Sequence, residues 1–254
     1  MMFAKFNMKL NIDDIDRDYS MCYRNILCAH SKAIKSTLES YILKNGNMEA
    51  DKIESEWFPQ VDADIFISHA HADEMLVKNF AGLLYEKYGI TCFVDSLVWN
   101  YADELLKQID NKYCRLSLIS EAGYNISKAN RYAAQVYLLL EGALAKMINN
   151  CECLIFLNTP NSLNISETIN EEKTSSAWIY NELLIAKTFP NRKLKEHRKE
   201  LSHSAIFESM EYKIDLNGFY DVTIKDFEKA GRKVIIKDPY AVLNELYRAK
   251  VSKV

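Results

Sequence analysis

From residue 61 to residue 188, short apolar runs alternate with longer segments in which apolar residues recur every three or four positions. The short runs are typical of buried strands, and the longer segments are typical of helices with one apolar face. A strand, a helix and a further strand in succession favour a parallel sheet with crossover helices. The sequence therefore predicts an α/β fold with strands over residues 63–68, 90–94 and 153–157.

Several expected helices have recognisable ends. Asp73 is a residue type that caps helices, and Gly89 can adopt the left-handed conformation that ends one, so a helix is expected between the first two strands. Ser175 or Ser176 can cap a later helix that ends before Pro190. We also expect a loop over 95–102, helices over 103–111, 133–147 and 240–250, and strands over 205–207 and 233–236.

The chain before residue 59 follows a different pattern. Apolar residues between about residues 13 and 44 are spaced as on one long helix or two, and Pro59 disfavours a helical conformation at Phe58. We therefore expect an N-terminal helical extension over 1–58 and the α/β domain over 59–254. Residues 112–130 have no clear period, which indicates a helical insertion at about 113–150.

Composition excludes some classes of function. Lys and Arg number 32 against 35 Asp and Glu, so no basic excess draws the chain to nucleic acid. The longest apolar runs are shorter than a membrane-spanning helix, and we expect no membrane segment and no signal peptide. The six cysteines show no repeated pair spacing. Reduced thiols and a cytoplasmic location are therefore expected.

Three polar clusters follow the three predicted strands, at residues 68–73, 95–103 and 175–182. Ligands bind beyond the carboxyl ends of strands in open parallel sheets, so these clusters are the candidate site. Trp178 and Glu182 are four residues apart and share one helix face, where an aromatic ring and a carboxylate can line the same pocket. Spacing alone favours a core tryptophan and a solvated glutamate over a functional pair.

Together the three clusters resemble the Toll/interleukin-1 receptor (TIR) domain family. The resemblance lies in Asp64-Ile-Phe-Ile-Ser-His69, in Cys92-Phe-Val-Asp95 and in Ser176-Ala-Trp-Ile-Tyr-Asn-Glu-Leu183. The W-x-x-x-E pattern preceded by serine is the most specific of these. The resemblance implies a flavodoxin-like parallel sheet flanked by helices, the TIR fold, here with the N-terminal helical extension.

In enzymatic TIR proteins the glutamate of this pattern is required to cleave the N-glycosidic bond of NAD+. The resemblance therefore implies that Glu182 is catalytic, that NAD+ is the substrate, and that no cofactor or metal is needed. It also implies a substrate-binding pocket lined by Trp178, Ser68, His69, Asp95 and Trp99. The chain departs from the family in the loop after the second strand, which lacks the usual glycine, and in His69-Ala70 after the first.

The residue types suit this chemistry. Departure of nicotinamide leaves an oxocarbenium-like cation on the ribose, which a nearby carboxylate can stabilise. Attack by water gives ADP-ribose, and attack by an atom of the same molecule gives a cyclic ADP-ribose isomer. The layout is also similar to bacterial TIR proteins, including the signalling subunit of Thoeris anti-phage defence, which makes a nucleotide messenger for a separate effector. Self-association is expected through the loop 96–102 or the N-terminal helices.

Four other interpretations compete. The main one is a non-catalytic TIR module that signals by assembly. His69-x-His71-x-Asp73 matches the start of a metal-binding pattern, but residue 74 is Glu where a histidine is needed. Asp95 at a strand end could accept a phosphoryl group, although the acidic pair expected after the first strand is absent. The charged run 192–200 alternates in sign, which favours a solvated connector over a nucleic-acid contact.

Overall fold

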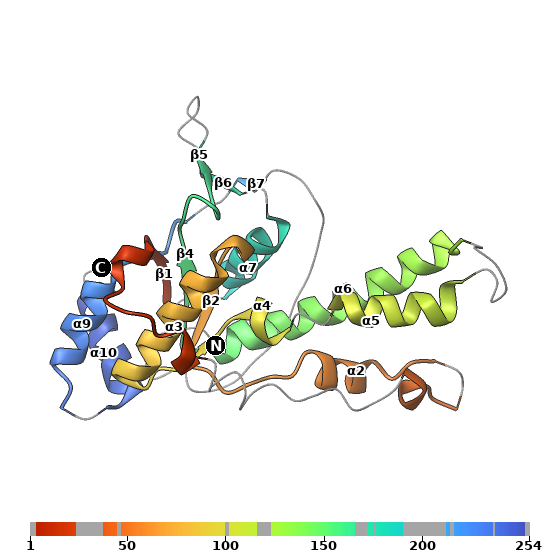
Figure 1. Ribbon diagram of the computed structural model, residues 1–254, viewed down its shortest axis with the longest axis horizontal. Helices are drawn as coiled ribbons and strands as arrows, with labels where there is room; N and C mark the ends of the chain where they lie inside the picture. Colours follow the sequence, from red (N-terminus) through yellow and green to blue (C-terminus); the bar gives the residue numbers. More distant parts are fainter. Residues whose placement is uncertain are drawn as a thin grey trace.

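The computed structural model describes residues 4–23, 38–44, 47–99, 102–115, 123–165, 172–174, 176–189, 212–213, 216–235 and 237–251. A five-stranded parallel sheet forms its centre, with the strand order β3-β2-β4-β1-β8. The strands are β1 (Ala4–Met8), β2 (Ile65–Ser68), β3 (Cys92–Phe93), β4 (Cys153–Leu157) and β8 (Tyr220–Val222). Helices flank the sheet, so the expected flavodoxin-like α/β architecture is confirmed (Figure 1).

Alternation along the strands divides the core into two halves. In β2, Ile65 and Ile67 join one hydrophobic cluster while Phe66 joins the other, and every residue of this strand is buried. The strand β4 is buried along its whole length in the same way. Both faces of the central strands are therefore covered, as a parallel sheet requires.

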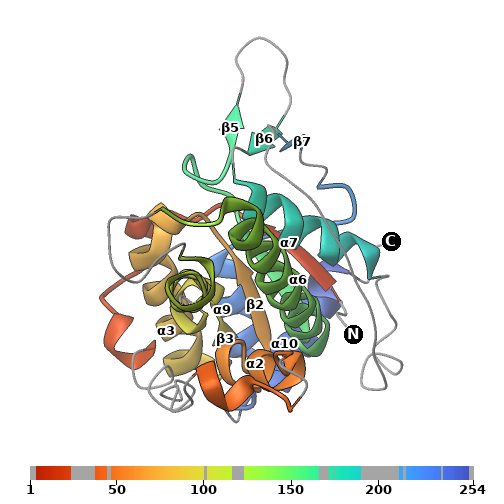
Figure 2. The same cartoon turned by 90° about the vertical axis from the view of Figure 1, so that its right-hand side faces the viewer.

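Each face has its own helices (Figure 2). One face packs against α3 (Glu74–Tyr88), α9 (Ile224–Arg232) and α10 (Pro239–Lys250). The other packs against α2 (Ala50–Trp57), α6 (Ile126–Asn150) and α7 (Ala177–Thr188). The helix α5 (Ala102–Ile109) continues into a π-helical turn at Asp110–Cys114 and lies along α6. In Figure 1, α5 and the first half of α6 extend from the body of the molecule as an arm.

Shorter elements complete the described chain. Three 3-10 turns cover Ile12–Asp14, Leu38–Tyr41 and His71–Asp73, and α4 is a single turn at Asp95–Val98. A separate three-stranded antiparallel sheet consists of β5 (Asn164–Ile165), β6 (Glu172–Thr174) and β7 (Tyr212–Lys213). Within the described residues, none of the helices is both long and apolar enough to cross a membrane.

Local sequence explains how the helices that matter for the site begin and end. The helix α3 ends at Gly89, whose φ of 75° is the left-handed conformation expected from its lack of a side chain. Ser176 precedes α7, and its hydroxyl accepts a hydrogen bond from the backbone N–H of Ile179. Both predicted helix ends are therefore confirmed.

The start of the chain differs from expectation. Residues 4–8 form β1, which lies between β4 and β8 and pairs Ala4 with Cys153 and Phe6 with Tyr220. The expected boundary at residue 58 is therefore wrong, because a strand of the central sheet lies within 1–58. Lys5 and Asn7 interrupt the apolar residues of this strand, which made it unrecognisable as a buried run. Of the helix expected over 13–44, residues 24–37 lie outside the described residues; residues 15–19 are not helical, whereas residues 20–23 are.

Other boundaries also shift. The expected loop over 95–102 begins with α4, and the helix expected over 133–147 extends from Ile126 to Asn150. The strand expected over 233–236 is wrong, because residues 233–235 form a turn after α9 and the edge strand is β8. The strand expected over 205–207 lies outside the described residues.

The strand order identifies where a ligand site is expected. The succession β3-β2-β4 matches the first three positions of a flavodoxin-like sheet, and the fourth position is filled by β1 from the start of the chain. The connections leave β2 and β4 toward opposite faces, since α3 follows β2 on one face and α7 follows β4 on the other. The carboxyl ends of β2 and β4 therefore flank the switch point at which such sheets bind ligands.

Candidate functional site at the carboxyl ends of β2 and β3

Glu182 lies in the second turn of α7 and is fully buried against the carboxyl end of β2. Ser68, the last residue of β2, is also fully buried and donates its hydroxyl to Oε2 of Glu182 over 2.6 Å. The other carboxyl oxygen, Oε1, has no hydrogen-bond partner among the described residues. One half of this carboxyl group is therefore held by Ser68, and the other half is buried without a partner among the described residues.

Asp95 and Trp178 form the second part of the site. Asp95 follows β3 and is buried, and its Oδ2 accepts a hydrogen bond from the indole N–H of Trp178. Trp178 is half-buried and lies one turn before Glu182 on α7. Asp95 therefore lies near both Trp178 and Glu182. This agrees with the expectation that the two side chains share one side of the helix.

His69 joins the cluster from the residue after β2. Its side chain is almost completely buried, with Nε2 3.0 Å from the hydroxyl of Ser96 and Nδ1 3.8 Å from Oδ1 of Asp95. Ser96 belongs to the predicted cluster 95–103 but is not one of the pocket residues named from the sequence, although its position directly after Asp95 is the signal that points to it. Five predicted residues, Ser68, His69, Asp95, Trp178 and Glu182, are thus brought together.

Burial sets the protonation of the two acids. Loss of hydration raises the pKa of Glu182 well above its ordinary value, and the negative charge of Asp95 raises it further. The hydrogen bond from Ser68 and the nearby indole of Trp178 only partly oppose this. Burial also raises the pKa of Asp95, against the opposing charge of His69. The folded state therefore favours the protonated, neutral form of Glu182.

Trp99 lies in a different environment. Its indole N–H donates to the backbone carbonyl of Pro59 over 3.2 Å, and its ring packs edge-on against Phe93 with centroids 4.9 Å apart. Phe58 contacts the same ring from another side. Trp99 is 5% exposed and belongs to the hydrophobic core. The structure therefore gives this residue a packing role and does not join it to the Glu182 cluster.

A second polar cluster follows β4. Asp73 is buried and its carboxylate accepts hydrogen bonds from the hydroxyl of Thr159 and from Nδ2 of Asn161. Ser162 links this loop to the carbonyl of Leu157 at the end of the strand. Asp73 stands at the N-cap position directly before α3, but its side chain makes no capping hydrogen bond there. The expectation that Asp73 caps this helix through its side chain is therefore wrong.

The rival metal site has no geometric support in this part of the chain. His69 is buried beside Asp95, whereas His71 is exposed. Over the residues that the structure describes, there is no group of three or more His, Cys, Asp or Glu side chains that could hold a metal ion.

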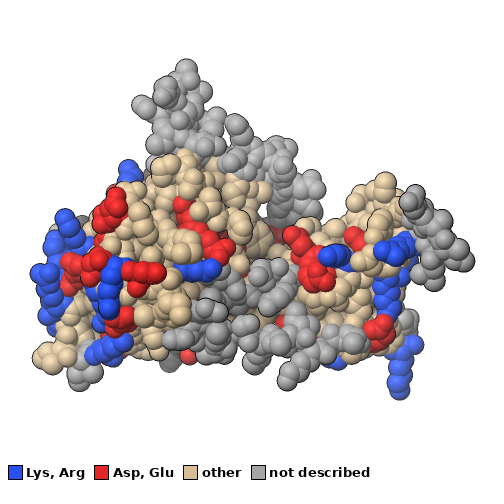
Figure 3. Space-filling model, viewed as in Figure 1, with Lys and Arg blue, Asp and Glu red and all other residues tan. Residues whose placement is uncertain are grey.

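Surface charge is mixed where it is densest. Figure 3 shows Lys and Arg side chains interleaved with Asp and Glu over the end of the molecule formed by α9 and α10. Lys233 lies 3.1 Å from Glu245, and Lys250 lies 2.8 Å from Asp226. In that view the positive charges are therefore neutralised locally and do not form a continuous phosphate-binding surface.

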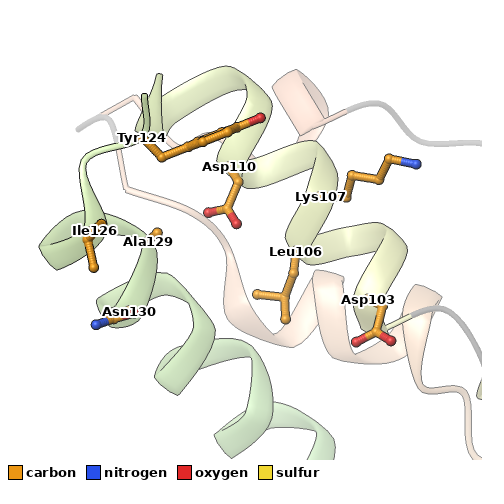
Figure 4. Close-up of a pocket in the computed structure, with 8 residues that line it drawn as sticks. All are labelled: Asp103, Leu106, Lys107, Asp110, Tyr124, Ile126, Ala129 and Asn130. Atoms are coloured by element: carbon orange, nitrogen blue, oxygen red, sulfur yellow. The ribbon is translucent and has the colours of Figure 1, made fainter. Parts of the chain in front are cut away.

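A pocket of about 460 Å³ lies on the arm, between α5 and the start of α6 (Figure 4). It is lined by Asp103, Leu106, Lys107, Asp110, Tyr124, Ile126, Ala129 and Asn130. None of these residues belongs to the cluster around Glu182.

The fold and the site define a class of protein: a parallel α/β protein with a buried Asp–Glu cluster at the carboxyl edge of its sheet. Such a cluster can hold or release a proton and, when ionised, can stabilise a positive charge. A comparison with family models, with curated proteins and with solved structures found no match to the chain.

Proposed function

We propose that the chain cleaves the bond between nicotinamide and ribose in NAD+, as enzymes of the TIR family do, with Glu182 as the catalytic carboxyl group. The observation that carries the proposal is the position of Glu182: fully buried at the carboxyl edge of the sheet, bound by Ser68 and near Asp95. A glutamate with no function would be expected to face solvent, because burying a carboxyl group costs free energy.

The charge of the substrate explains how a neutral acid becomes useful. The pyridinium ring of NAD+ is a cation, and a cation close to a carboxyl group favours its ionised form. Binding of NAD+ next to Glu182 would therefore lower the raised pKa and expel the proton. The carboxylate then faces the positive charge that develops on the ribose as nicotinamide departs. Preorganised groups of this kind contribute about 2.7–4 kcal/mol each to the transition state.

The neighbouring residues would orient this carboxylate and shape the pocket. Ser68 holds Oε2, which leaves Oε1 for a ribose hydroxyl. Asp95 fixes the indole of Trp178, which limits the access of water from one side. His69 would contact the substrate from the end of β2. Trp99 would act on the pocket only indirectly, through its packing in the hydrophobic core.

We further propose that the product is an ADP-ribose derivative, linear or cyclic, that serves as a messenger in anti-phage immunity. A separate effector would read it, as in the Thoeris system, and the reaction would take place in the cytoplasm. Self-association through the loop 96–102 or the N-terminal helices would regulate it. These statements rest on the resemblance of the three strand-end segments to TIR proteins.

The test is release of nicotinamide from NAD+, measured by chromatography, with the protein alone and with extract of phage-infected cells. Wild type should release nicotinamide under at least one condition, and Glu182→Gln should reduce the rate about 100-fold or more. Glu152→Gln is the matched control, because Glu152 is also buried but directly precedes β4, at the opposite edge of the sheet. Its rate should equal that of wild type. Mass spectrometry then identifies the product.

The alternative function is a TIR module that signals by assembly without catalysis. It predicts that wild type and Glu182→Gln release equal amounts of nicotinamide in the activating extract. That result would refute the proposal of an NAD+-cleaving enzyme.

A further inference from the structure

The helix α6 has a second seam besides the one that packs on the core. Its inner seam contains Val136, Leu140, Ala143 and Met147, all buried. The other side of the helix stays exposed over the part that forms the arm (Figure 1). Leu138 is 45% exposed and the adjacent Tyr137 is 49% exposed there.

Four residues of this exposed side are spaced as in a coiled coil. Arg131, Ala134, Leu138 and Glu141 are separated by three, four and three positions, which is the spacing of successive seam positions in a heptad. We call these four residues the outer seam. Arg131, Ala134 and Leu138 are exposed, and Glu141 is half-buried. No helix among the described residues packs against this seam, so it can accept a helix from outside.

The outer seam is complementary to itself when reversed. Reversal about residue 136 brings Ala134 opposite Leu138 and Arg131 opposite Glu141. The small side chain of Ala134 then faces the large side chain of Leu138, and the cation of Arg131 faces the anion of Glu141. Each of these two contacts occurs twice in the dimer. This is the relationship that a twofold axis imposes on two identical helices. A parallel arrangement would instead oppose Arg131 with Arg131.

Glu141 is the half-buried member of the outer seam. Its Oε1 is buried without a hydrogen-bond partner among the described residues, and burial raises the pKa of the carboxyl group. A guanidinium group from a second helix would stabilise the ionised form. Arg131 is exposed, and its planar donor group suits such a contact.

We propose that two copies of this chain associate through the outer seam of α6, with the two helices antiparallel about a twofold axis near residue 136. This interface is separate from the loop 96–102 and from the N-terminal segment, and it does not depend on the proposed catalytic activity. The contact is small, so the dissociation constant is expected to be on the order of 10 μM.

Sedimentation velocity of the full chain over a series of concentrations tests the proposal. Wild type should shift from monomer to dimer, and Leu138→Glu should weaken the dimer at least tenfold, because it buries a charge at the centre of the seam. Met75→Glu is the control, since Met75 is 62% exposed on α3, outside the seam. It should leave the dimer unchanged, and circular dichroism should show all variants folded.

Charge reversal tests the antiparallel register. R131E and E141R should each weaken the dimer, because each places like charges opposite one another. The double variant R131E/E141R should recover dimerisation, and an equimolar mixture of the two single variants should form dimers of unlike chains. The proposal is overturned if wild type stays monomeric up to about 100 μM, if Leu138→Glu has no effect, or if neither the double variant nor the mixture recovers association.

Discussion

The hydroxyl of Ser68 lies 2.6 Å from Oε2 of Glu182 and ties the last residue of β2 to the second turn of α7. Both side chains are fully buried, so water cannot replace either partner. The bond therefore determines which way the carboxyl group of Glu182 faces at the edge of the sheet.

Replacing Ser68 by alanine should destabilise the protein by about 1–3 kcal/mol, because it leaves a buried carboxyl group without a described donor. The loss should also raise the pKa of Glu182 further, since this bond lowers it. Urea unfolding measures the change. Ser96→Ala is the comparison: its hydroxyl is only half-buried, and water can replace it as the partner of His69. Equal losses of stability for Ser68→Ala and Ser96→Ala would show that the buried bond from Ser68 to Glu182 contributes no more than the bond of a half-buried hydroxyl.

Glu182→Gln should change how stability depends on pH. The unfolded chain titrates this carboxyl near its ordinary pKa of about 4.3, whereas the folded chain titrates it higher. Between the two values the folded state holds the extra proton, so wild type loses up to about 1.4 kcal/mol per pH unit as pH rises. Glutamine does not titrate. The variant should therefore gain stability relative to wild type as the pH rises from about 5, as measured by urea unfolding. A difference that stays constant over this range would contradict the raised pKa.

Two tryptophans offer a matched pair for separating site from core. Trp178→Phe and Trp99→Phe each remove one indole N–H, the first from Asp95 and the second from the carbonyl of Pro59. Each should cost about 1 kcal/mol of stability. Only Trp178→Phe should also slow nicotinamide release, because Trp99 contacts Phe58 and Phe93 in the core. Equal rates of nicotinamide release for the two variants would show that Trp178 is not part of the site.

Phe6→Ala tests whether the start of the chain belongs to the sheet. Phe6 is fully buried on β1 and stacks on Tyr247 of α10. Its removal should destabilise the whole protein by about 3–5 kcal/mol. Ile12→Ala removes a side chain that is 54% exposed nearby and should cost less than about 0.5 kcal/mol. If residues 1–58 were an independent extension, Phe6→Ala would instead leave the main unfolding transition unchanged.

Two helical glycines should respond to alanine with opposite signs. A Cβ at Gly82 on α3 would lie 2.0 Å from the backbone oxygen of Tyr19, so Gly82→Ala must displace the N-terminal segment and should destabilise. A Cβ at Gly142 on α6 meets nothing within 4 Å. Gly142→Ala should therefore stabilise by about 0.5–1 kcal/mol, the difference in helix propensity. Thermal unfolding of both variants measures the two signs.

The sequence predicted the parts of the fold whose signals are local. The strands β2 and β4 are continuous apolar runs, and α7 has its cap at Ser176, so each could be recognised without a partner. The strands β1 and β8 contain polar residues such as Lys5 and Asp221, so their membership of the sheet depends on neighbours far away in the chain. Lys5 itself donates to the carbonyl of Phe189 at the end of α7.

The site residues divide in the same way, into those that local signals predict and those that depend on tertiary contacts. The rule that functional groups gather after parallel strands brought Ser68, His69 and Asp95 together with α7 correctly. Trp99 also follows a strand, but packing against Phe58 and Phe93 determines its direction, and no local pattern contains that information. The carboxylate of Asp73 likewise binds Thr159, a tertiary partner, in preference to the backbone of its own helix.

The position of β1 also has a consequence for biosynthesis. This strand leaves the ribosome well before its neighbours in the sheet, β4 and β8, are translated. During elongation its edges have no native strand to pair with, and contacts of such long sequence separation form slowly. The edges of β1 therefore stay unpaired, and open to wrong contacts, until β4 and β8 have been synthesised.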